Sequence, residues 1–172
     1  MEIEIILSNT LLKAKAKTEE ISNMLLNNKV SVAELIKVAQ VSNDSEKATC
    51  IEAIEYATKL KSEISSSACF AFVTKTLLEK APRIKWESAK VIGNIAHLYP
   101  EILNDAVKNL LTNSEHAGTV VRWSAAFALG EILKLRTNRN KNLIPAIESI
   151  VKREEQNSIR KIYLAALKKV AN

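Results

Sequence analysis

Glycine and proline are scarce in this sequence, with three of each among 172 residues. A β-sandwich or β-barrel has Gly- or Pro-rich turns every ~8–12 residues, so the scarcity of both residues excludes these folds. Disorder is excluded as well, because 47% of the residues are apolar. The composition favours helices, and a chain of this length is expected to form one all-α domain with a substantial core.

Cysteine and long apolar runs are also rare. Cys50 and Cys69 are the only cysteines, without CxxC spacing or a nearby histidine. We therefore expect buried, reduced thiols rather than a disulfide or a metal site. The apolar runs are too short to span a membrane, and residues 1–7 lack the basic segment of a secretory signal. These absences predict a cytoplasmic protein with no membrane segment.

Enzyme motifs are missing. His97 and His116 belong to no metal-ligand pattern, and the sequence has no Gly-rich phosphate loop or nucleophile elbow. Glu154 and Glu155 are adjacent at the end of a predicted helix, so we expect both to lie in solvent. The sequence therefore predicts a protein that is not an enzyme and that uses no cofactor or metal.

What the sequence does contain is an internal repeat. A basic residue recurs with spacings of 38, 37 and 38, at Lys47, Lys85, Arg122 and Arg160. Apolar residues follow each cation in the same frame, and Gly93 and Gly130 occupy one equivalent position. This period is typical of repeats that are built from helix pairs. Each glycine costs ~1 kcal/mol relative to Ala in mid-helix, which predicts a close approach between helices there.

Apolar periodicity divides each repeat into two helices. We expect first helices at about 46–60, 83–98, 120–136 and 158–171, and second helices at about 66–80, 101–112 and 142–153. An additional N-terminal pair is expected at about 9–27 and 32–41, with residues 2–5 as a frayed helix start. The prediction is one domain, 1–172, made of the N-terminal pair 9–41, the repeats 46–80, 83–112 and 120–153, and the terminal helix 158–171.

The segments 120–132 and 143–151 resemble the two helices of a HEAT-like repeat, the short kind found in phycobilin lyases. The resemblance is strong over 83–171, weaker over 46–80 and only permissive before that. It implies an α-solenoid of about four to five helix pairs whose second helices line a shallow concave surface. It also implies a partner-binding role, because such solenoids are mostly binding surfaces.

The repeat frame predicts which residues lie between the stacked layers. We expect burial at six apolar positions of the first helices, namely Ala89, Ile92, Ala126, Leu129, Ala166 and Leu167. The terminal helix mixes cations with Ile162, Tyr163 and Leu164. Exposed apolar surface there would favour self-association or a bound partner, and the alternative is a simple cap with Tyr163 half-buried. The sequence leaves the oligomeric state open.

Positive charge is concentrated in the C-terminal half. Residues 1–86 have 12 basic and 11 acidic side chains, a net charge of +1, whereas residues 87–172 have 13 and 8, a net charge of +5. The repeated cations Lys47, Lys85, Arg122 and Arg160, which we name the cation ladder, could follow a phosphate backbone. Alternatively, each of them caps or bridges a neighbouring repeat.

A second group of cations lies in a lengthened loop. Lys134, Arg136, Arg139 and Lys141 fall within eight residues without an acidic residue, and Lys152 and Arg153 follow near the next loop. Insertions in solenoids often border a binding surface. The alternative is a solvated loop next to a helix C-terminus, where the helix dipole favours cations.

Trp86 and Trp123 occupy one repeat position beside the ladder cations. Their rings could stack on bases or hold a cation, and the repeat type and basic character resemble the HEAT-like alkylpurine DNA glycosylases. Those enzymes use an aspartate together with tryptophans, but Lys90 and Phe127 stand one turn after the two tryptophans here. Core packing is therefore the favoured interpretation. The sequence predicts a non-catalytic scaffold for a protein partner, and the alternative function is nucleic-acid binding.

Overall fold

The computed structural model describes residues 2–171, which form helices and no strands. The predicted all-α fold class is confirmed. The helices are α1 (Glu2–Ser8), α2 (Ala14–Leu26), α3 (Val32–Val41), α4 (Asp44–Leu60), α5 (Ser67–Thr76), α6 (Pro82–Ile95), α7 (Asn104–Asn113), α8 (Thr119–Lys134), α9 (Asn140–Arg153) and α10 (Asn157–Ala171).

Local sequence signals explain several helix boundaries. Ser31 forms a capping box with Glu34 at the start of α3, and Pro82 is the first residue of α6. The N-terminal helix expected from residue 9 begins only at Ala14, because residues 9–13 form a turn between two helices. In that turn the Asn9 side chain accepts a 2.9 Å hydrogen bond from the Leu11 amide, which offers the backbone an alternative to the helix.

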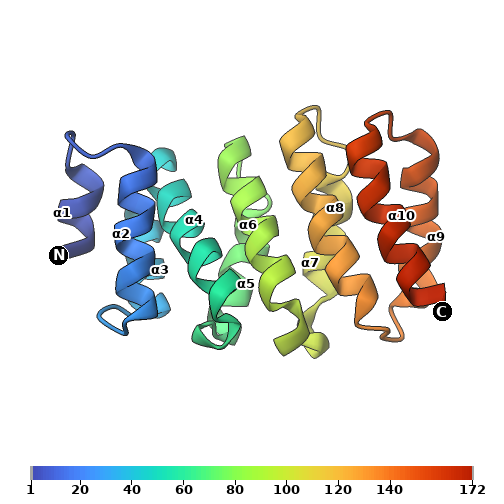
Figure 1. The fold of residues 1–172 in the computed structure, drawn as a ribbon, viewed down its shortest axis with the longest axis horizontal. Coiled ribbons are helices and arrows are strands. Elements are labelled where there is room, and N and C mark those ends of the chain that lie inside the picture. The colour runs from blue at the N-terminus through green and yellow to red at the C-terminus, as the bar shows by residue number, and fades with distance from the viewer. Residues whose placement is uncertain (1, 172) are drawn as a thin grey trace.

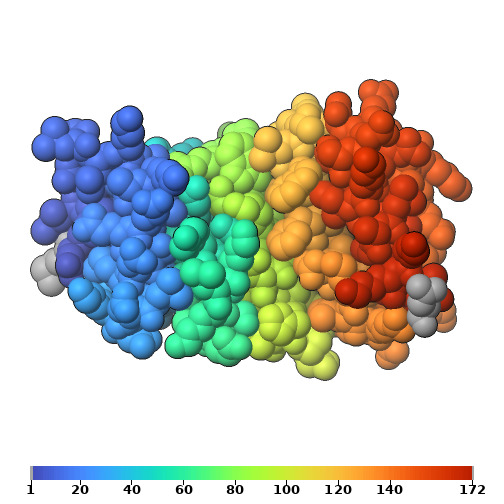
Figure 2. All heavy atoms as spheres, in the orientation of Figure 1, coloured from blue at the N-terminus to red at the C-terminus, as the bar shows by residue number. Residues whose placement is uncertain are grey.

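The helices form two layers along a solenoid (Figure 1). The first helices α2, α4, α6, α8 and α10 lie in front, and the second helices α3, α5, α7 and α9 lie behind them. Each first helix packs against the next first helix, and α4, α6, α8 and α10 also pack against the second helix that precedes them in the chain. Figure 2 shows the first helices as adjoining bands of atoms across this face. The buried apolar side chains therefore form one core that continues along the solenoid.

The two layers are not equally close-packed. Successive first helices contact each other extensively, whereas α5 contacts α3 and α7 much less. Open hollows of about 560 Å³ and 180 Å³ lie between α5 and α7 and between α7 and α9. Because a solenoid curves toward its more closely stacked layer, the first helices line the inner face. The expectation that the second helices line the concave surface is wrong.

The repeat frame identified the core correctly. Ala89, Ile92, Ala126, Leu129 and Ala166 are buried, and only Leu167 is partly exposed. Both mid-helix glycines lie where a neighbouring first helix approaches, because a Cβ on Gly93 would overlap the Phe127 ring and a Cβ on Gly130 would lie 3.4 Å from the Cβ of Ala166.

Two further expectations can be compared with the structure. Cys50 and Cys69 are both buried and free, as predicted. Burial raises the pKa of each thiol to about 12, which makes the reactive thiolate rare. Within residues 2–171, no helix is long and apolar enough to cross a membrane.

Candidate protein-binding surface

The inner face is formed by one solvent-facing stripe from each first helix. Helices α4, α6 and α8 have first helices on both sides and second helices behind, so only this face is open. The stripe of α6 contains Arg83, Trp86, Lys90 and Asn94, and the stripe of α8 contains Val120, Trp123, Phe127 and Glu131. We name these side chains, together with Glu52 and Tyr56 of α4, the inner strip.

The part of the inner strip between α4 and α6 is ionic. Arg83 donates a 2.5 Å hydrogen bond to Glu52 across the helix boundary, and Thr18 of α2 donates a 2.8 Å bond to the same carboxylate. Three successive first helices are therefore connected at Glu52.

Lys90 lies between two buried carboxylates. Its ammonium is 3.3 Å from Glu55 and 3.0 Å from Glu87, and Glu87 also accepts a 2.7 Å bond from the Trp86 indole. Burial raises the pKa of Glu87 despite these contacts. Burial also disfavours the charged form of Lys90, but the two carboxylates outweigh that effect and raise the pKa of the ammonium. The charged groups of this cluster already pair with one another within the protein. We therefore infer that they stabilise the inner strip and do not bind a ligand.

The part between α6 and α8 is aromatic. Trp123 is 40% exposed and stacks on Phe127, with ring centroids 6.2 Å apart and an interplanar angle of 12°. Phe127 in turn covers Gly93. The favoured interpretation of Trp123 as a core residue is wrong, because its position is on the open side of α8, and Trp86 is only half-buried. An exposed, ordered aromatic pair of this kind is a typical centre for a protein interface.

The cation ladder lies at one edge of the solenoid. Each of its members is the fourth residue of a first helix. Lys47 pairs with Glu79 at 3.1 Å. Lys85 donates bonds of 3.0 Å to the Leu77 carbonyl and 3.2 Å to the Asn113 side chain. Lys85 thus connects the C-terminal ends of two successive second helices, where the helix dipole favours a cation.

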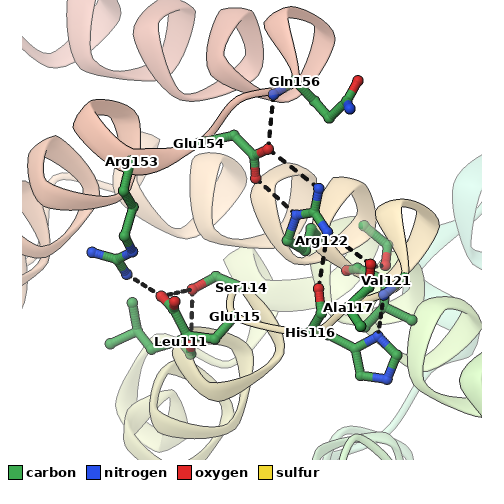
Figure 3. Close-up of polar contacts among 12 residues, drawn as sticks. Leu111, Ser114, Glu115, His116, Ala117, Val121, Arg122, Arg153, Glu154 and Gln156 are labelled. Atoms are coloured by element: carbon green, nitrogen blue, oxygen red, sulfur yellow. Dashed lines mark hydrogen bonds and ion pairs between the residues drawn. The ribbon is translucent and has the colours of Figure 1, made fainter.

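Arg122 makes the most extensive contacts of the ladder (Figure 3). Its guanidinium donates bonds of 2.9 Å and 3.4 Å to Glu154 and bonds of 2.9 Å and 3.0 Å to the carbonyls of His116 and Ala117. Glu154 is buried, so the expectation that it lies in solvent is wrong, whereas Glu155 is exposed. Burial opposes ionisation of Glu154, but the bonds from Arg122 and from the Gln156 amide lower the pKa of its carboxyl overall.

A cleft of about 310 Å³ lies beside this pair. Arg153 pairs with Glu115 at its other wall (Figure 3). Two predicted cations, Arg122 and Arg153, are therefore brought to one cleft, but each already has a carboxylate partner. The cleft offers no unpaired positive charge to an anion.

Arg160, the last member of the ladder, has no such partner. Its Nε atom is buried and makes no hydrogen bond within residues 2–171. The other ladder cations bond to a side chain at the end of the second helix that follows them, and α10 is not followed by a second helix in the described part of the chain.

The predicted cations of the lengthened loop are used largely within the molecule. Lys134 pairs with Glu131 at 2.5 Å. Arg136 donates a 2.8 Å bond to the Lys169 carbonyl, and Arg139 bonds to the Asn104 side chain at 2.8 Å and to the Glu101 carbonyl at 3.2 Å. These two arginines connect neighbouring repeats at the edge opposite the ladder. Lys141 and Lys152 are exposed and have no partner among the described residues.

In the terminal helix Leu164 is a large apolar residue that is exposed. Tyr163 is fully buried, so neither the expected exposure nor the expected half-burial of its ring holds. Burial raises the pKa of its phenol, whose oxygen has no partner within residues 2–171. Leu164 is 47% exposed.

The residues missed by sequence reasoning are mainly acceptors. Glu79, Asn113 and Glu154 follow their ladder cations by 32, 28 and 32 residues, a spacing that could have identified them. In residues 2–171, no three His, Cys, Asp or Glu side chains are grouped so as to hold a metal ion.

Comparisons with solved structures place this arrangement among helical repeat proteins. A computationally designed armadillo repeat protein for modular peptide recognition superposes with a TM-score of 0.75 and 15% identity, covering 97% of this chain and 80% of that one. The fold is an armadillo-like helical-repeat solenoid. A designed armadillo repeat protein in complex with the peptide (KR)4 resembles this solenoid with a TM-score of 0.69 and 15% identity, covering 97% and 79% of the two chains.

A natural protein has a similar solenoid. The complex of CpcE and CpcF of phycocyanin lyase from Nostoc sp. PCC7120 contains a chain with a TM-score of 0.73 and 16% identity, covering 95% of this chain and 96% of that one. No protein-family model and no curated protein matches this sequence. The HEAT-like resemblance noted from the sequence therefore holds at the level of the fold.

Proposed function

We propose that the chain is a non-catalytic scaffold that binds a protein partner along its inner strip. The observation that carries this proposal is the exposed Trp123 stacked on Phe127 on the inner face of α8. Trp is enriched at the energetic centres of interfaces because it buries a large area with little loss of conformational freedom. The contacts of Phe127 with Gly93 hold this pair in place before binding.

The ionic part of the strip supports an extended ligand. Glu52 and Arg83 are partly exposed polar groups on the two first helices that precede the aromatic pair of α8. They could meet polar groups of a peptide while its apolar side chains cover Trp123. The designed armadillo repeat proteins with a similar fold include one for modular peptide recognition and one in complex with a peptide, which agrees with a peptide segment as the partner of this chain.

Comparative affinity capture tests the proposal. Wild-type protein is compared with Trp123→Ala and with Leu78→Ala, a matched truncation of an exposed apolar residue beside the outer hollow. We expect a partner that is retained by the wild type and by Leu78→Ala, and whose recovery falls at least tenfold with Trp123→Ala. Recovery that is equal for all three proteins, or that is lost only with Leu78→Ala, would show that the inner strip is not the binding surface.

Nucleic-acid binding is a second candidate, supported by the exposed and unpaired Lys141 and Lys152. Phosphate contacts make affinity fall steeply with salt. A mobility-shift titration at two salt concentrations should then show binding that is stronger at low salt and weaker in Lys141→Ala/Lys152→Ala for every sequence alike. Absence of a shift at low salt would eliminate this function.

A further inference from the structure

One side of α10 is open to solvent, although the equivalent side of the earlier first helices is buried. Leu164 stands four residues after its ladder cation, and the equivalent residues are at most 1% exposed, namely Ile51, Ala89 and Ala126. Leu164 itself is 47% exposed. One repeat position is thus buried in three first helices and open in the fourth.

The position eight residues after the cation leads to the same conclusion. Gly93 and Gly130 occupy it in α6 and α8, where Phe127 and Ala166 of the next first helix approach them. Lys168 occupies it in α10 and is exposed. The side of α10 that contains Leu164 and Lys168 is therefore the side on which a further helix would pack.

This side of α10 contains two cations, Arg160 and Lys168, four residues before and four residues after Leu164. Residues 157–171 contain four basic residues and no acidic residue. The Nε atom of Arg160 is buried without a partner, whereas Lys47 and Arg122 each have a glutamate. A helix that packed on this side would complete the pattern if it brought carboxylates.

Such a helix lies at the other end of the solenoid (Figure 1). In α1, Ile3, Ile6 and Leu7 are buried against the rest of the protein, whereas Ile5 is 69% exposed on the opposite side. The helix carries Glu2 and Glu4 and no cation. Beside it is a largely apolar hollow of about 540 Å³ that is lined by Glu4, Ile5, Leu7, Ser8, Ser42 and Glu46.

We propose that α10 of one molecule packs against α1 and its hollow on a second copy of this chain. Leu164 and Ile5 provide the apolar centre, and the cations of α10 face the carboxylates of α1 and Glu46. Because the two surfaces are different, the contact is heterologous and continues from copy to copy as an open chain or a ring. This association is independent of the inner strip.

Two end variants test the proposal with the whole chain. Ile5→Asn introduces an amide on the α1 side, and Leu164→Asn introduces one on the α10 side. Val120→Asn is the matched control, because Val120 is 52% exposed but lies on the inner strip. In sedimentation over a range of concentrations, the mass of the wild type and of the control should rise with concentration. The dissociation constant of each end variant should be at least tenfold higher.

A mixture of the two end variants is the decisive measurement. Each keeps one intact surface, so the mixture should give a dimer with one copy of each variant and nothing larger. Salt should weaken this dimer because exposed charges contribute to it. Dimer formation in the mixture also shows that both variants are folded.

Three results would overturn the proposal. A wild type that remains monomeric at all concentrations has no such contact. An Ile5→Asn protein that associates like the wild type would indicate a symmetric contact between two α10 helices. A mixture in which no mixed dimer forms would show that the two surfaces do not recognise each other.

Discussion

Gly93 of α6 lies directly against the ring of Phe127 of α8, without space for a methyl group between them. A Cβ at position 93 would be 2.8 Å from Cδ1 of Phe127 and closer still to Cε1. The glycine costs ~1 kcal/mol in helix propensity, and the close packing of two first helices offsets this cost.

Gly93→Ala should therefore destabilise the protein by about 1–3 kcal/mol, the usual range for overpacking. Gly130→Ala is the matched comparison, because its Cβ would make an ordinary contact at 3.4 Å with Ala166, and we expect it to stabilise by up to about 1 kcal/mol. Denaturant unfolding measures both. In the Gly93→Ala background, Phe127→Leu should lower the free energy of unfolding less than it does in the wild type, because the smaller side chain relieves the overlap. Equal effects of the two alanines would contradict this packing.

The Arg122–Glu154 pair predicts a dependence of stability on pH. The pKa of Glu154 is lower in the folded protein than its ordinary value, so its charge stabilises the fold above the unfolded pKa, and this contribution is lost as the pH falls through the folded pKa. At neutral pH, Glu154→Gln should cost about 1–3 kcal/mol, because Arg122 loses a charged acceptor. The difference from wild type should shrink on acidification. A constant difference across pH would rule out the charge as its cause.

Lys90→Met should lower the free energy of unfolding, because it leaves two neighbouring buried carboxylates without their ammonium partner. Without the ammonium, Glu55 and Glu87 lose these ion pairs, and we expect the free energy of unfolding to fall by about 1–3 kcal/mol at neutral pH. Burial raises the pKa of Glu87, so protonation of this carboxyl at low pH should recover part of the lost free energy of unfolding. Lys134→Met removes a more exposed pair with Glu131 and should cost less than about 1 kcal/mol. If the two variants lose similar amounts of unfolding free energy, the burial of Glu55 and Glu87 is not the reason for the effect of Lys90→Met.

Arg136, two residues after the end of α8, has a φ of 53°, in the left-handed region. A side chain with a Cβ is strained there by about 1–2 kcal/mol. Arg136→Gly relieves this strain, whereas Arg136→Ala retains it, and both lose the bond to the Lys169 carbonyl. Thermal unfolding should show the glycine variant to be the more stable of the two by about 1 kcal/mol. If the alanine variant is as stable, the backbone conformation is not strained.

The fold could be predicted because its signals are periodic. The ladder cations gave the repeat, and the apolar positions relative to them gave the buried residues, including Ala89 and Leu129. Helix boundaries were less predictable at the N-terminus, where the hydrogen bond of Asn9 within a turn separates two segments that apolar periodicity would join.

The surface was harder to predict, because the sequence does not show in which of the two layers the helices pack more closely against one another. Trp86 and Trp123 share a repeat position, but whether that position faces the core or the inner face depends on the direction of curvature. Likewise, Glu154 looks like a solvated residue beside Glu155 until Arg122 is placed next to it. Such pairings depend on residues about thirty positions apart, which local patterns do not connect.

The unequal packing of the two layers has a mechanical consequence. The first helices form a stiff spine, and polar bonds such as those of Lys85 and Arg139 fasten successive repeats at both edges. The second helices are separated by hollows, so the most compliant deformation of the molecule is a flexing that widens or narrows the space between α5 and α7. A ligand wedged into that space would change the curvature of the inner face without touching it.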